Sequence, residues 1–100
     1  MRILAIDTST PVGSIAIVEG AVLRAQHILN ISATHNQRLL PGIDRILMET
    51  EWSLNDLDAL AVSLGPGSFT GLRIGISIAK GLAWATGKPL AGVPTLDALA

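Results

Sequence analysis

The sequence contains no cysteine, no tyrosine and one phenylalanine among its 100 residues. Without cysteine, disulfides and thiolate metal sites are excluded within these residues. Charged residues make up 15% of the sequence and the formal net charge is −1, which excludes electrostatic capture of nucleic acid by this chain alone. Hydrophobic residues make up 49%, too many for a disordered segment. The composition predicts one folded domain. If this domain acts on RNA, we expect a partner protein to bind the RNA.

Two further site classes lack the residues that they need. His27 and His35 are eight residues apart with no carboxylate at ligand spacing, so the sequence predicts no metal site. A G-x-S-x-G nucleophile elbow is also absent. No signal peptide precedes the first apolar run, and Arg73 and Lys80 interrupt the most apolar helix. We therefore expect a cytoplasmic protein without membrane contact.

Apolar runs separated by turn residues predict five strands and two helices. The strands are Ile3–Asp7, Gly13–Glu19, Ala21–Leu29, Asp58–Leu64 and Leu90–Val93, and the helices are His35–Thr50 and Phe69–Thr86. Three strands joined by short turns must be antiparallel, whereas the later strands follow helical crossovers and must be parallel. The expected sheet order is 3-2-1-4-5 with both helices on one face. This is the α/β topology of a ribonuclease-H-like or actin-like ATPase lobe.

A single lobe of this kind accounts for all 100 residues, and the pattern predicts the start of a new helix at Thr95, shortly before the sequence ends at Ala100. We therefore interpret residues 1–100 as an N-terminal lobe whose second lobe is not present in this chain.

The glycine-rich stretch Gly65–Arg73 joins the central strand to the second helix. It lacks the third glycine of a dinucleotide fingerprint and the GK[ST] of a P-loop, which favours a tight structural turn, with Ser68 or Thr70 as the helix cap. In the helix that follows, Gly71, Gly75 and Ala79 recur every four residues on one face. This stripe has two interpretations: close contact with the chain's own sheet, or contact with a helix of a second subunit.

Other side chains are assigned by position. Asp7, with Thr8 and Ser9, follows a buried strand and is a candidate phosphate or nucleotide site; alternatively, Asp7 caps its own turn. Trp52 and Trp84 are expected to be packing residues. The apolar face of the first helix is expected to comprise Leu39, Leu40, Ile43, Ile46 and Leu47.

At four places the sequence resembles the TsaB (YeaZ) family, bacterial partner proteins in threonylcarbamoyladenosine formation on tRNA. The matching stretches are Ile3–Ser9, His35 with Arg38–Pro41, Gly65–Gly75 and Lys80–Ala83. The resemblance covers nearly the whole chain, and the GPGSFTGLR block is specific. It implies the actin/sugar-kinase/Hsp70 ATPase fold, usually built as two lobes.

The resemblance also implies a function without catalysis. The catalytic paralogue TsaD carries two metal-binding histidines four residues apart, and Thr95 and Leu99 occupy the matching positions here. No catalytic or metal-binding residue is therefore expected; the family implies a scaffold that binds and activates TsaD, or forms a homodimer in its absence, through its two helices. The implied partner-binding residues are His35, Arg38, Leu39, Ile43, Gly71, Gly75, Ile78, Ala79 and Leu82.

The same resemblance implies how the remaining partners and cofactors are bound. A TsaE-like ATPase is expected to act on this chain only indirectly. The chain is expected to contact tRNA only through the complex, and to bind ATP or ADP with magnesium only at a partner interface. Two alternatives stay open: an ATP-binding phosphotransferase or ATPase lobe, with Asp7 in its phosphate loop, and a metallopeptidase-like protein.

Overall fold

The computed structural model describes residues 1–8, 12–30, 35–65 and 69–93. In chain order the elements are β1 (Arg2–Asp7), β2 (Val12–Glu19), β3 (Val22–Asn30), α1 (His35–Thr50), the short 3-10 helix η1 (Leu54–Asp56), β4 (Ala59–Ser63), α2 (Phe69–Thr86) and β5 (Leu90–Val93). All five predicted strands and both helices predicted within residues 35–86 are present, and their bounds differ from the prediction by one residue or none. The helix expected from Thr95 lies outside the described residues.

The five strands form one mixed sheet in the order β3-β2-β1-β4-β5, as predicted. The pairs β1–β2 and β2–β3 are antiparallel, while β4 runs parallel to β1 on one side and to β5 on the other. Gly20 makes the reversal between β2 and β3 with a φ of 61°, a conformation that glycine adopts without steric penalty. The sheet thus combines an antiparallel meander with two parallel crossovers.

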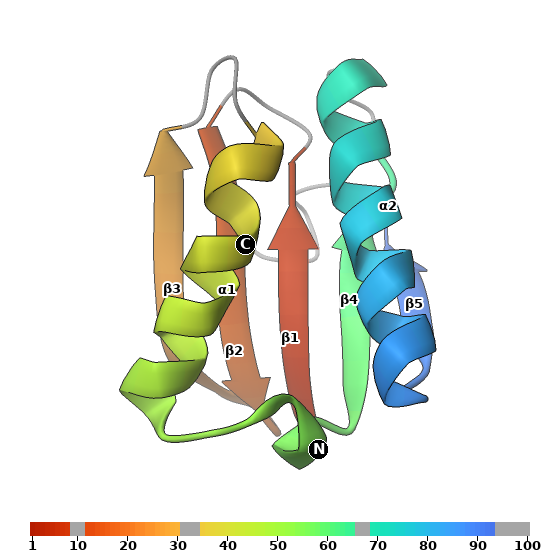
Figure 1. Ribbon diagram of the computed structural model, residues 1–100. Helices are drawn as coiled ribbons and strands as arrows, with labels where there is room; N and C mark the ends of the chain where they lie inside the picture. Colours follow the sequence, from red (N-terminus) through yellow and green to blue (C-terminus); the bar gives the residue numbers. More distant parts are fainter. Residues whose placement is uncertain (9–11, 31–34, 66–68, 94–100) are drawn as a thin grey trace.

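Both helices cover the same face of this sheet (Figure 1). Helix α1 contacts β3 and β2, and α2 contacts β4, β1 and β5. Side chains alternate along each strand, so one set from every central strand points at the helices. The buried core formed in this way consists of Leu4, Ile6, Ile15, Ile17, Leu39, Ile43, Ile46, Leu47, Leu57, Leu60, Val62 and Ala79. No described helix covers the other face.

The amino end of β1 is fixed by a polar and aromatic cluster. The Arg2 guanidinium lies 4.5 Å from the centroid of the Trp52 ring, and Arg2 Nε donates to Glu19 Oε2 at 3.2 Å. Trp52 also packs against the core, so the prediction of a packing role is confirmed for this residue. The cluster ties β1, β2 and the end of α1 together at the edge opposite the glycine-rich turn.

Candidate functional site

The carboxyl ends of β1 and β4 lie at the same edge of the sheet, because the two strands are parallel. Parallel sheets commonly bind ligands at this edge. Asp7, Thr8 and Ser63 are collected there, with exposed fractions of 6%, 1% and 3%. The backbone N–H of Gly65 reaches Ser63 Oγ at 3.4 Å. The edge therefore holds a compact polar cluster with very little surface open to a ligand.

Thr8 is enclosed by helix α2 at Gly75. A Cβ built on Gly75 would overlap Thr8 Oγ1 and lie 3.2 Å from both Thr8 Cβ and Cγ2. The missing side chain of Gly75 is what lets α2 approach the end of β1. Of the candidate phosphate residues, Asp7 and Thr8 are thus buried against the chain itself, and Ser9 lies outside the described residues.

The glycine stripe of α2 accordingly faces inward. Gly75 and Ala79 are both buried, and Ala79 belongs to the core. Close contact with the chain's own sheet is the interpretation that fits these two positions. Gly71 lies in α2, but its surroundings, like the side chains of His35 and Arg38 and the cap residues Ser68 and Thr70, fall outside what the structure describes.

Several of the expected partner-binding residues are buried in the core or packed against it. Leu39, Ile43 and Ala79 are at most 2% exposed, whereas Ile78 and Leu82 are half-buried and pack against the core. Buried side chains leave no surface for a partner in this conformation. The part of the helix pair that a partner could reach is the side turned away from the sheet.

We call this side the outer face. Its exposed residues are Leu40, Pro41, Asp44, Arg45 and Met48 on α1, and Arg73, Ser77, Lys80, Gly81, Trp84 and Ala85 on α2. Met48 and Trp84 are 78% and 89% exposed, and Leu40 is 47% exposed. Most polar-face positions of a helix carry charged side chains, so three large apolar residues here indicate a contact surface.

Two of these residues correct the expectations from sequence. Leu40 was expected on the core face of its helix, but it lies at the edge of the outer face. It follows the buried Leu39 by one residue, and one residue of an α-helix turns the side chain by about 100° around the axis. Trp84 was expected to be a packing residue and is instead exposed. It follows Arg73 and Ser77 by eleven and seven residues, a spacing that places all three on one side of α2. That spacing is the signal that could have revealed it.

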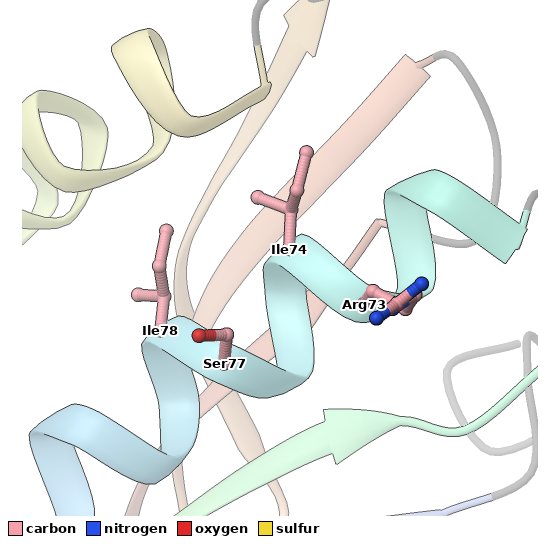
Figure 2. A pocket seen from close by; sticks show the side chains of 4 residues that line it. All are labelled: Arg73, Ile74, Ser77 and Ile78. Carbon is pink, nitrogen blue, oxygen red and sulfur yellow. The ribbon is translucent and has the colours of Figure 1, made fainter.

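The outer face includes an open depression of about 390 Å³ along α2, lined by Arg73, Ile74, Ser77 and Ile78. Ile74 and Ile78 point to the same side of the helix, one turn apart, and Arg73 points away from them (Figure 2). The depression has an apolar wall and a cationic end.

Charges are distributed unevenly between the two helices. Helix α2 contains Arg73 and Lys80 and no acidic residue, whereas α1 contains Asp44 and Glu49 beside its basic residues. Glu49 Oε2 contacts His27 Nε2 at 2.8 Å, and Glu49 Oε1 lies 3.6 Å from Arg45 Nε. The acidic side chain of α1 nearest its carboxyl end is therefore engaged within the chain.

Among the described residues, no group of three or more His, Asp or Glu side chains could hold a metal ion. Within the same part of the chain, no helix is long and apolar enough to cross a membrane.

Comparisons with known proteins agree with this fold and extend it. Residues 28–100 match the model of the TsaD family, tRNA N6-adenosine threonylcarbamoyltransferase. The chain is 48% identical over 100 residues to the tRNA threonylcarbamoyladenosine biosynthesis protein TsaB of Escherichia coli, covering all of this chain and 43% of that protein. It is 38% identical to TsaB of Bacillus subtilis, covering 44% of that protein.

Solved structures give the same result. YeaZ from Pseudomonas aeruginosa superposes with a TM-score of 0.86 at 40% identity, covering 93% of this chain and 43% of that chain. RuvC from Thermus thermophilus superposes with a TM-score of 0.62 at 15% identity, which shows a shared ribonuclease-H-like fold alone. The chain spans less than half the length of the curated relatives that it matches.

The fold and the family expected from the sequence are both confirmed: the sheet order matches an actin-like, ribonuclease-H-like lobe, and the relatives are TsaB proteins over the whole chain. The chain belongs to the TsaB (YeaZ) family of tRNA threonylcarbamoyladenosine biosynthesis proteins, within the wider family that the threonylcarbamoyltransferase model describes.

Proposed function

We propose that this chain is a non-catalytic docking subunit in the formation of threonylcarbamoyladenosine on tRNA, binding and activating a TsaD protein through the outer face of its helix pair. The single observation that carries the proposal is the exposure of Leu40, Met48 and Trp84 on this one face. Exposed apolar side chains gathered on one side of a domain are typical of a protein–protein interface.

A lobe of the same fold is the partner that suits this face. Such a lobe would present its own pair of helices, and packing two helix pairs together buries apolar residues from all four helices. The charged residues Asp44 and Lys80 at the margins would form the polar rim that such interfaces have. Transfer chemistry would then reside in the TsaD partner, and tRNA would be bound through the complex.

The test is an affinity measurement between this chain and the TsaD protein of the same organism. Met48→Asp places a charge at the centre of the outer face, and we expect it to weaken binding at least tenfold. Ile28→Asp is the matched control. Ile28 is 69% exposed, and it points away from the helices because its neighbour His27 contacts Glu49 of α1.

Two results would count against the proposal. Equal loss of affinity in both variants would mean that the outer face has no special part in binding. Equal rates of threonylcarbamoylation by TsaD with and without this chain would remove the activating role. Both variants change exposed positions, so circular dichroism should show the same folded structure as the original chain.

Nucleotide binding is assigned to the partner interface rather than to this chain alone. Thr8 is enclosed by α2 at Gly75, so a phosphate held by Thr8 would require this contact to open. Calorimetry with ATP and magnesium should therefore give no heat of binding with the chain alone and measurable heat with the TsaD complex. Tight binding by the isolated chain would favour the phosphotransferase alternative.

A further inference from the structure

The outer face carries one sulfur atom, that of Met48. The sequence has no cysteine and two methionines, Met1 and Met48, so all the oxidisable sulfur of this chain is thioether sulfur. Met48 is 78% exposed and Met1 is 73% exposed, which gives a dissolved peroxide access to both side chains. Of the two, Met48 lies on the surface assigned to docking.

The backbone at Met48 is held in place although its side chain is open to solvent. The Met48 carbonyl oxygen accepts from the Glu51 N–H at 3.1 Å, and the Leu47 carbonyl oxygen accepts from the Trp52 N–H at 3.0 Å. With Glu51 at a φ of 61°, these two bonds form a Schellman motif that ends α1. Trp52 packs against the core directly afterwards. The thioether therefore projects from a fixed turn.

A peroxide converts such a thioether into a sulfoxide. The sulfur lone pair attacks one oxygen of hydrogen peroxide, the O–O bond breaks, and the other oxygen leaves as water after a proton moves to it. Sulfur loses two electrons and the peroxide gains them. The product is polar where the side chain was apolar, and methionine sulfoxide reductases reverse the change.

The sulfoxide acts differently on the free chain and on a docked complex. In the free chain the Met48 side chain is exposed, so water solvates the new oxygen, while the neighbouring Ile46 and Leu47 stay buried in the core. In a docked interface the same oxygen would leave water for an apolar surface, and a buried polar group without a partner is costly. Oxidation of Met48 therefore weakens docking without weakening the fold.

We propose that oxidation of Met48 by a peroxide is a reversible switch on docking, in which the thioether form binds the TsaD partner and the sulfoxide form is released. This inference rests on the proposed function and names a regulation of the same surface. Hydrogen peroxide is the oxidant, and methionine sulfoxide reductases supply the return step.

The test compares the chain before and after oxidation. The chain is treated with hydrogen peroxide, the peroxide is removed, and peptide mass spectrometry identifies the oxygen added at Met48 and at Met1. Calorimetry should then show an affinity for TsaD that is lower by about fivefold or more, and incubation with the reductases should restore it. Met48→Leu is the matched control, because Met1 still oxidises in it. Its affinity before and after peroxide should be equal, whatever its absolute value.

Protection from oxidation gives a second measurement that needs no variant. Met48 should oxidise more slowly in the TsaD complex than in the free chain. Met1 is the internal reference, since its carbonyl oxygen accepts from the Gly20 N–H at the turn between β2 and β3, and it should oxidise at the same rate in both samples. Urea unfolding should give the same free energy for the oxidised and the untreated chain.

Four results overturn the inference: the oxidised chain binds TsaD as tightly as the untreated chain; Met48→Leu loses affinity on oxidation by the same factor; Met48 oxidises equally fast in the free chain and in the complex; or oxidation lowers the free energy of unfolding. Each of these leaves the proposed function standing if the untreated chain binds TsaD. Absence of TsaD binding by the untreated chain refutes the proposed function and this inference together.

Discussion

Gly75 and Gly81 form a matched pair for measuring how tightly α2 is held to the sheet. Both lie inside the same helix, so replacing either by alanine gains about 1 kcal/mol of helix propensity. At Gly81 the new Cβ meets no atom within 4 Å, whereas at Gly75 it would overlap Thr8 Oγ1 and lie 3.2 Å from Thr8 Cβ and Cγ2. Thr8 is 1% exposed and β-branched, so it has little freedom to move aside.

The propensity gain cancels between the two variants, and the remaining difference is the cost of overpacking at Gly75. Overpacking typically costs about 1–3 kcal/mol. Gly81→Ala should therefore stabilise the fold by about 1 kcal/mol, and Gly75→Ala should be about 1–3 kcal/mol less stable than Gly81→Ala.

Urea unfolding followed by circular dichroism measures both free energies, and thermal melting should separate the two midpoints by about 4 °C or more. Thr8→Ala in the Gly75→Ala background removes Oγ1 and Cγ2 and should recover part of the loss. Equal stability of the two glycine variants would refute the close contact between α2 and β1.

Three further changes test other parts of the structure. Gly87 ends α2 with a φ of 72° and donates its N–H to Ala83 O at 2.9 Å; Gly87→Ala should cost about 1–2 kcal/mol, and a melting point as high as that of Gly81→Ala would contradict this. Ile46 is fully buried, so Ile46→Ala should lower the free energy of unfolding by about 2–5 kcal/mol, as measured in urea. The Ser53 N–H donates to Asp56 Oδ2 at 2.7 Å and holds the pKa of Asp56 below 3.8, which an NMR titration should show. A lowered pKa stabilises the fold above the pKa of the unfolded carboxyl, and this stability is lost as pH falls through the folded pKa; Asp56→Asn should therefore be more destabilising at neutral pH than well below pH 3.8.

The sheet could be predicted from sequence because its signals are local. Short turns force the first three strands to be antiparallel neighbours, and helical crossovers force the later strands to be parallel. The apolar residues Leu4 and Ile6 on β1 and Leu60 and Val62 on β4 then pair side by side in the observed register. Each of these constraints depends on only a few consecutive residues, so no knowledge of the tertiary structure was needed.

The orientation of α2 could not be predicted in the same way. This helix has two charged residues in eighteen, so apolar and small residues occur all round it and its periodicity barely distinguishes two faces. Gly71, Gly75 and Ala79 recur every four residues, but so do Ser77, Gly81 and Ala85. The contact between Gly75 and Thr8 and the burial of Ala79 show that these two positions face the sheet, and Trp84 is placed on the outside as a consequence.

The series that contains Gly75 therefore packs inside the fold, whereas the series that contains Gly81 lies on the surface. Experiments on docking should use variants of the surface series. A bulky residue at Gly75 would displace α2 from β1 and damage the fold, so lost binding in such a variant would say nothing about an interface. Gly81 and Trp84 are exposed on the opposite side of the same helix, where a change of side chain leaves the core untouched. A loss of binding caused there is a property of the surface itself, because the contact that holds α2 to the sheet is the buried one at Gly75.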